Sequence, residues 1–171
     1  MFKKKRHRGG FPDLINLIQQ RPHAAAILRG SAAYPHIQGM VLFYQTSRGV
    51  LVTSRVSGLP DATDDCRSPI FGFHIHAGEE CTGNAQDPFV DAGAHFNPQH
   101  CPHPFHAGDL PPLFGNHGYA LSAFLTDRFT VPAIEGKTVI IHDQADDFTS
   151  QPGGNAGNRI ACGKIKRNAG S

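Results

Sequence analysis

Residues 71–76 read Phe71-Gly72-Phe73-His74-Ile75-His76, and this short run decides how the rest of the sequence is interpreted. Side chains alternate between the two faces of a β-strand, so His74 and His76 point to the same side. Two imidazoles arranged in this way form a chelating pair for a metal ion; the alternative is a pair of histidines on the solvent face of a strand. The run therefore predicts a strand that carries a candidate metal site.

Short runs with a strand-like pattern lie on both sides of this one. They are rich in Val, Ile, Phe and Ala, are separated by clusters of Gly, Pro and Asp, and span residues 24–28, 39–44, 50–56, 117–125, 138–142 and 159–165. Regular turns between such runs favour antiparallel pairing. Two long connections, 77–116 and 143–158, interrupt the pattern, and loops of this length usually carry function. We expect an all-β fold, an antiparallel β-sandwich or flattened barrel with two long functional loops.

Length and hydrophobicity fit one domain with an N-terminal extension. The chain has 171 residues, of which 39% are hydrophobic, so one core is expected. No stretch reaches the roughly 18 consecutive apolar residues of a membrane-spanning helix. We place the extension at residues 1–22 and the β domain at residues 23–171. Within the extension, one or two helical turns are expected around Leu14, Ile15, Leu17 and Ile18.

The net charge of +2 comes from a basic run in the extension, which consists of Lys3, Lys4, Lys5, Arg6 and Arg8. Without this run, eleven basic residues face fourteen acidic ones, so we expect neither nucleic acid nor a membrane as a partner. No small-residue cleavage site follows the run, and we therefore expect no signal peptide. The expected location is cytoplasmic, with export to the periplasm or the extracellular space as the alternative.

Histidine is the main anomaly of the composition, because six of the 11 histidines fall within residues 74–106. His142 ends the expected strand 138–142, and His95 lies in a Gly-Ala-His-Phe-Asn-Pro turn at residues 93–98. Together with the pair at residues 74 and 76, they would give four converging imidazoles. An all-nitrogen ligand set of this kind suits copper.

A second candidate cluster follows at His103, His106 and Asp109. Two imidazoles and one carboxylate are three of the four tetrahedral ligands that zinc prefers, and His95 could supply the fourth through its other ring nitrogen. One imidazole would then bridge two metals. His100 lies close enough to compete with His103, and the spacing leaves both open. A hydrated polar loop is the alternative for this cluster.

Five motifs resemble those of the copper/zinc superoxide dismutase family, in the same order, and the resemblance covers residues 23–166. The motifs are the strand 72–76, the turn 93–98, the segment 106–110, the strand 139–142 with residues 145–147 behind it, and a C-terminal signature at 154–163. The resemblance implies a Greek-key antiparallel β-barrel with immunoglobulin-like topology. It also implies superoxide dismutase activity, in which copper cycles between Cu(II) and Cu(I).

The resemblance assigns a role to each candidate residue. Copper would be bound by His74, His76, His95 and His142. Zinc would be bound by His103, His106, Asp109 and the bridging His95. Arg159 would guide the superoxide anion, and His95 would detach from copper on reduction and carry a proton. Asp146 would hydrogen-bond one histidine of each metal site.

The resemblance also pairs Cys81 with Cys162 in a disulfide, whereas Cys66 and Cys101 match no position of the family that we can assign. These two would form a second bridge or remain free thiols. Superoxide is the implied substrate, and a homodimer is compatible with the family. Three rival interpretations are a copper-only dismutase, a non-catalytic copper-binding module of the same fold, and a β domain held together by structural zinc.

Overall fold

A computed structural model describes residues 14–61 and 69–168, so the basic run at residues 3–8 and Cys66 lie outside the described residues. The described strands are β1 (Ala24–Gly30), β2 (Gln38–Thr46), β3 (Gly49–Ser57), β4 (Ile70–Phe71), β5 (Phe73–His76), β6 (Leu113–Phe114), β7 (Tyr119–Thr126), β8 (Thr138–His142) and β9 (Arg159–Arg167). The helices are α1 (Leu14–Gln19), α2 (Val131–Ile134) and a 3₁₀ helix, η1 (Val90–Ala92).

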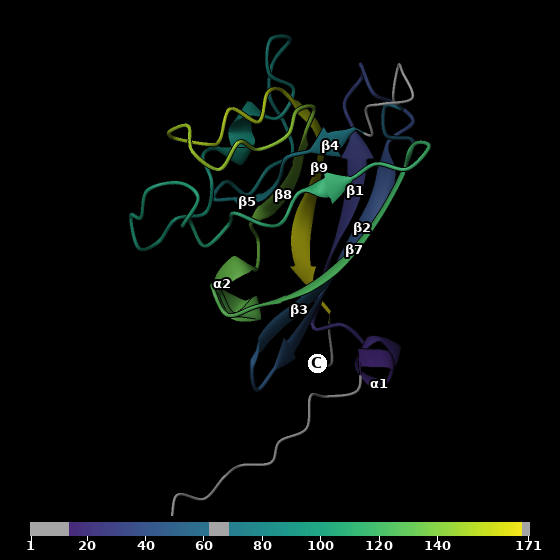
Figure 1. Cartoon of the computed structure of the whole chain (residues 1–171), viewed down its shortest axis with the longest axis vertical. Coiled ribbons are helices and arrows are strands. Elements are labelled where there is room, and N and C mark those ends of the chain that lie inside the picture. The colour runs from purple at the N-terminus through teal and green to yellow at the C-terminus, as the bar shows by residue number, and fades with distance from the viewer. Residues whose placement is uncertain (1–13, 62–68, 169–171) are drawn as a thin grey trace, which may run out of the picture.

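Within the described residues, seven strands form one curled antiparallel sheet in the order β5-β8-β9-β1-β2-β3-β7 (Figure 1). The strands β4 and β6 pair separately as a two-stranded sheet. The all-β prediction is confirmed, and every pairing between these strands is antiparallel. Among the described helices, none combines the length and the apolar character needed to cross a membrane.

The interior of the curled sheet is filled by the apolar side chains of alternate strand positions. In β1, Ala24, Ala26 and Leu28 are buried while the residues between them are not, as expected for a strand with one face on a core. The largest fully buried side chains include Phe43, Phe71, Phe73, Leu113, Ile134 and Ile165. One of these, Ile134, comes from α2, a helix that the sequence did not predict.

The expectation of one strand over residues 71–76 is wrong at Gly72, where the chain leaves β4 and enters β5. The Gly72 amide donates to Gln144 O over 2.7 Å, and Gly72 O accepts the His142 amide over 2.8 Å. A side chain here would collide with the Ala156 Cβ. The break therefore ties the start of β5 to the chain just beyond β8.

The expected strand 117–125 also begins later than predicted, at Tyr119. His117 and Gly118 both have positive φ, 49° and 75°, and they form a tight turn closed by hydrogen bonds between Asn116 and Tyr119. A strand cannot include such a turn.

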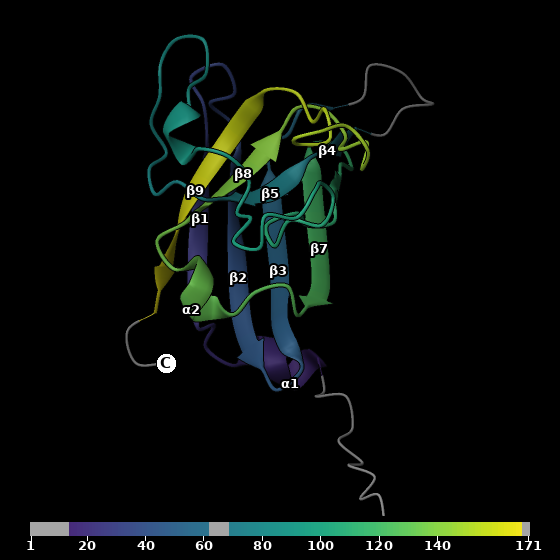
Figure 2. The ribbon, with the colours of Figure 1, turned by 90° about the vertical axis from the view of Figure 1, so that its left-hand side faces the viewer.

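The edge of β5 that does not face β8 holds the loop between η1 and β6. Ile75 O accepts the Phe96 amide over 2.8 Å, and the Ile75 amide donates to Gly108 O over 2.9 Å. The Gly108 amide in turn donates to Phe96 O over 2.8 Å. Figure 2 shows this loop in front of the large sheet, beside β5. One strand edge therefore brings the segments around residues 95 and 109 next to the histidines of β5.

Candidate metal centre

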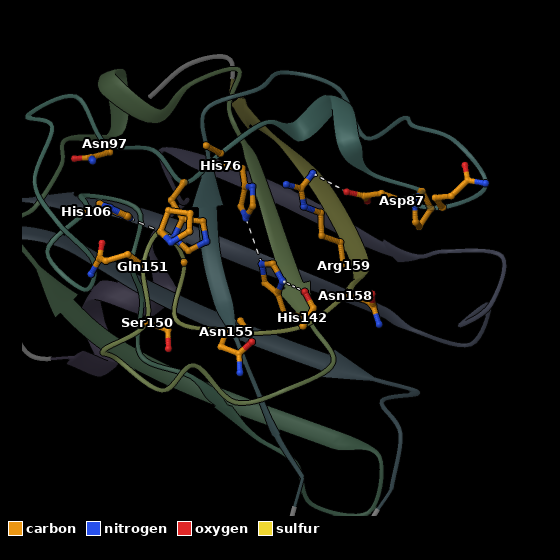
Figure 3. Close-up of a pocket in the computed structure, with 18 of the residues that line it drawn as sticks. His76, Asp87, Asn97, His106, His142, Ser150, Gln151, Asn155, Asn158 and Arg159 are labelled. Atoms are coloured by element: carbon orange, nitrogen blue, oxygen red, sulfur yellow. Dashed lines mark hydrogen bonds and ion pairs between the residues drawn. The ribbon is translucent and has the colours of Figure 1, made fainter.

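The first group of ligand atoms is the four-histidine cluster, which consists of His74, His76, His95 and His142. In the part of the chain that the structure describes, its four ligand nitrogens lie within 4.8 Å of one another. The strand β5 supplies the first two side chains, the end of β8 supplies His142, and the turn at residues 93–98 supplies His95. The Nε2 atoms of His76 and His142 face each other at 3.3 Å (Figure 3).

Three of the four rings in this cluster are oriented by groups that only accept hydrogen bonds, and each group faces the ring nitrogen that points away from the cluster. His76 Nδ1 lies 2.8 Å from Gly93 O, His142 Nδ1 lies 3.2 Å from Gly157 O, and His74 Nε2 lies 2.7 Å from Asp146 Oδ2. The nitrogen that faces an acceptor must carry the hydrogen, so the opposite nitrogen presents its lone pair to the cluster. Among the described residues, the buried His74 Nδ1 has no hydrogen-bond partner. This buried, unpaired nitrogen fits a metal ligand.

Burial keeps the imidazoles of His74, His76 and His142 neutral. The pKa values of His74 and His76 lie below the usual value, and that of His142 falls to about 3, mainly because burial disfavours the charged ring. At neutral pH the rings are therefore in the unprotonated form that binds metal ions.

The second group is the mixed cluster, which consists of His95, His103, His106 and Asp109. Asp109 Oδ1 lies 2.7 Å from His95 Nδ1, and Asp109 Oδ2 lies 3.1 Å from His103 Nδ1. The Nδ1 atoms of His95 and His106 are 3.4 Å apart. Although Asp109 is near, the buried His103 Nδ1 makes no hydrogen bond among the described residues. Three nitrogens and one carboxylate oxygen that face a common point match a tetrahedral zinc site.

Asp109 is ionised in this setting. Burial alone would raise its pKa, but the hydrogen bond with His95 and the neighbouring histidines outweigh that effect and lower it. A carboxylate is the form in which Asp binds a metal ion.

The carboxylate of Asp146 joins the two clusters. Its Oδ2 accepts from His74 Nε2, and its Oδ1 accepts from His103 Nε2 over 2.9 Å. Burial would raise the pKa of Asp146, but hydrogen bonds from His74, the Phe148 amide and His103 lower it to about 2. Gly154, at φ 69°, lies so close that a side chain there would collide with both Asp146 and His103.

The structure distinguishes His103 from His100, which the spacing left as alternative ligands for zinc. His103 is buried inside the mixed cluster. His100 is exposed, has a φ of 55°, and lies outside both clusters. The short spacing between His103 and His106 is therefore compatible with a complete set of four donors.

A cleft of about 1080 Å³ opens over the clusters and is lined by His76, His95, His142 and Arg159. The Arg159 guanidinium is fixed by two carbonyls, since Nη1 donates to Phe89 O over 2.7 Å and Nη2 donates to Gly93 O over 2.8 Å. Asp87 Oδ2 lies 3.3 Å from Nη1, on the outer side of the arginine (Figure 3). No motif in the sequence pointed to this acidic neighbour.

The disulfide between Cys81 and Cys162 is present, with a Cα–Cα distance of 5.6 Å and a sequence separation of 81. It joins the start of the loop 77–116 to β9, the strand that carries Arg159. Cys101 has a free thiol, and its former candidate partner, Cys66, lies outside the described residues.

Two further side chains contact the mixed cluster and were missed by sequence reasoning. Gln151 hydrogen-bonds the main chain of His103, and Arg128 hydrogen-bonds carbonyls between residues 104 and 109. Neither belongs to a motif, and both reach the cluster from segments that are distant in the sequence. No local pattern reveals contacts of this kind.

A curled antiparallel sheet that carries two adjacent, largely buried donor clusters joined by one histidine defines a protein with a binuclear metal centre. Residues 37–165 match the family described as copper/zinc superoxide dismutase (SODC), and the chain belongs to this family.

Curated relatives agree with this family assignment. Superoxide dismutase [Cu-Zn] 2 of Aquifex aeolicus is 34% identical over 143 residues, which cover 75% of this chain and 78% of that protein. Superoxide dismutase [Cu-Zn] of Legionella pneumophila is 33% identical over 136 residues, covering 75% and 77%. Superoxide dismutase [Cu-Zn] A of Xenopus laevis is 32% identical over 158 residues, covering 83% and 95%.

Proposed function

We propose that the protein is a superoxide dismutase that converts superoxide to dioxygen and hydrogen peroxide, with copper at the four-histidine cluster and zinc at the mixed cluster. The observation that carries the proposal is the membership of His95 in both clusters. A structural zinc site needs only one set of four donors, so a second nitrogen set beside it supports a redox metal. Residues 23–171 form the enzymatic domain of this proposal, and residues 1–22 its N-terminal extension.

When bound, copper supplies one-electron exchange between Cu(II) and Cu(I), and zinc supplies a fixed positive charge beside it. The chain's own residues provide substrate binding, orientation and proton transfer. Arg159 is the residue that binds the anion: it lines the cleft, and its two carbonyl bonds hold the guanidinium plane while other N–H groups remain available.

His95 is the residue that we assign to proton transfer. Its Nδ1 lies among the donors of the mixed cluster, 2.7 Å from Asp109 Oδ1, and would be held there by zinc. The ring would then keep its position while the opposite nitrogen, Nε2, takes up a proton and releases it. The ring also lines the cleft, which gives the proton a short route to a bound substrate.

The segment from residue 61 to residue 147 carries thirteen acidic residues against three basic ones, which would repel an anion. Arg159 and two metal cations in a cleft offset this repulsion locally. A homodimer also belongs to the proposal, without an assigned contact surface, and sedimentation of the full chain tests it.

The test of the function is the rate of superoxide loss catalysed by protein loaded with copper and zinc, beside a sample loaded with copper alone. We expect a rate constant of about 10⁸ to 10⁹ M⁻¹s⁻¹ for the sample loaded with copper and zinc. Equal rates in both samples would make the protein a copper-only dismutase. Negligible turnover at full copper occupancy would make it a copper-binding module.

A further inference from the structure

The segment that carries the mixed cluster is short, with only Pro104 and Phe105 between His103 and His106. Two side chains from outside this loop, Gln151 and Arg128, bond its main chain.

Gln151 holds His103 through a reciprocal pair of hydrogen bonds. Its Oε1 accepts the His103 amide over 2.9 Å, and its Nε2 donates to His103 O over 2.8 Å. A side-chain amide that both donates and accepts reproduces the pair of hydrogen bonds that two opposite residues exchange in an antiparallel sheet. In the pocket, Gln151 lies on the His106 side (Figure 3).

The loop 143–158, which carries Gln151, also holds the ring of His103. Asp146 accepts from His103 Nε2, so residues 146 and 151 fix the imidazole and the backbone of one ligand. With both ends of the residue held, the unpaired Nδ1 stays directed at the centre of the mixed cluster.

Arg128 holds the other half of the cluster. It follows β7 in the chain, and its Nη1 donates to Pro104 O over 3.0 Å, to Asp109 O over 3.1 Å and to His106 O over 3.4 Å. One cationic nitrogen thus hydrogen-bonds three carbonyl oxygens of the turn that contains His106 and Asp109. Bonds from a charged donor are stronger than neutral ones.

We propose that Gln151 and Arg128 are positioning residues for zinc, which hold the mixed cluster in its binding geometry before the metal arrives. Together they bond the main chain of His103, His106 and Asp109, and the remaining member, His95, is bonded to Asp109. The inference rests on the proposed zinc site. Because neither residue bonds His76 or His142, zinc binding depends on them far more than copper binding does.

The experiment compares the metal-free full chain with its Gln151→Ala and Arg128→Ala variants. Zinc affinity is measured by competition with a chromophoric chelator, and the geometry is measured from the visible absorption of Co²⁺ added in place of zinc. Loss of a group that supports a ligand typically weakens metal binding about 10- to 100-fold, and we expect this loss for zinc in each variant. We expect weaker tetrahedral Co²⁺ bands and a copper affinity within about 3-fold of the parent.

Two conservative variants sharpen the test. Arg128→Lys keeps a charged donor for the three carbonyls, and we expect it to recover much of the zinc affinity. Gln151→Glu can still accept the His103 amide but cannot donate to His103 O, so we expect little recovery. Gln86→Ala, an exposed glutamine lining the same cleft, and Arg55→Ala, an exposed arginine on β3, are matched controls with unchanged zinc affinity.

Unchanged zinc affinity in both alanine variants would overturn the inference, and so would an equal loss of zinc and copper affinity, which would indicate general destabilisation. Failure of the parent to bind Co²⁺ at a tetrahedral site would overturn the zinc site itself and this inference with it. If the variants lose zinc affinity but the parent does not remove superoxide, only the proposed function fails.

Discussion

The two clusters share a histidine and are almost equally buried, yet their surroundings differ. His76 and His142 are held by single carbonyls, and their cluster opens into the cleft beside Arg159. His103 is held on its ring and its main chain, and of the three residues that belong to the mixed cluster alone, His106 lines that cleft whereas His103 and Asp109 do not. Under the proposed function, we infer that the clusters have two tasks: one meets the substrate, and the other keeps the shared histidine in place.

If the two clusters act separately, one metal site can be lost while the other remains, and this is the strongest effect that we expect. We expect His142→Ala to remove copper binding and activity while zinc binding and the folded domain remain, because His142 belongs to the four-histidine cluster alone. Metal content by elemental analysis and far-ultraviolet circular dichroism check this. His100→Ala is the control, since His100 lines the cleft outside both clusters. Full copper content in His142→Ala would contradict its role.

We expect the disulfide to matter more for the surroundings of the four-histidine cluster than for those of the mixed cluster. Replacing Cys81 and Cys162 together by Ser should lower the free energy of unfolding by about 2 to 4 kcal/mol, because the bridge restricts the unfolded chain. Urea unfolding of the metal-free protein measures this loss. Since the bridge joins β9 to the loop that supplies Gly93 O, we expect activity to fall more than zinc affinity does. A larger loss in zinc affinity would reverse the comparison.

Arg159 separates substrate capture from metal binding. Arg159→Ala should lower the rate of superoxide loss by about 10-fold, while copper and zinc content stay unchanged. Arg159→Lys keeps the charge but not the paired carbonyl bonds, so its rate of superoxide loss should lie between those of the parent and of Arg159→Ala. Stopped-flow rates at several salt concentrations check both variants, and a parent rate that does not fall with salt would remove the steering argument.

The smallest expected effect belongs to Asp87. Its carboxylate offsets part of the Arg159 charge, so Asp87→Asn should raise the rate by about 2-fold at low ionic strength and steepen its decrease with salt. Glu79→Gln removes a charge of the same sign near Lys137, away from Arg159, and is the control. A lower rate in Asp87→Asn would show that Asp87 orients the arginine instead.

The sequence predicted the parts of this structure that repeat a local pattern. Alternation indicated the strands, and the two-residue spacing put His74 and His76 on one side. One exception was Gly72, where the break depends on contacts with Gln144 and Ala156 that no alternation records. The helix α2 was missed for a similar reason, because its four residues are fixed by burial of Val131 and Ile134.

Within the site, the donor types and their order were visible in the sequence, whereas the groups that orient them were not. Gly93 O and Gly157 O act through the main chain, which carries no residue signature. Gln151, Arg128 and Asp87 are common polar residues in loops, and only the fold brings them to the metal centre or to Arg159. The choice between His100 and His103 likewise depended on the path of the loop.

We propose that one copper and one zinc occupy different clusters that share His95. Crystals of the metal-loaded protein, with diffraction data collected above and below the copper and zinc absorption edges, locate each metal separately. We expect a copper peak among the four histidine nitrogens and a zinc peak between His103, His106 and Asp109, with His95 between the two. A zinc peak bound by His100, or both metals at one cluster, would contradict it.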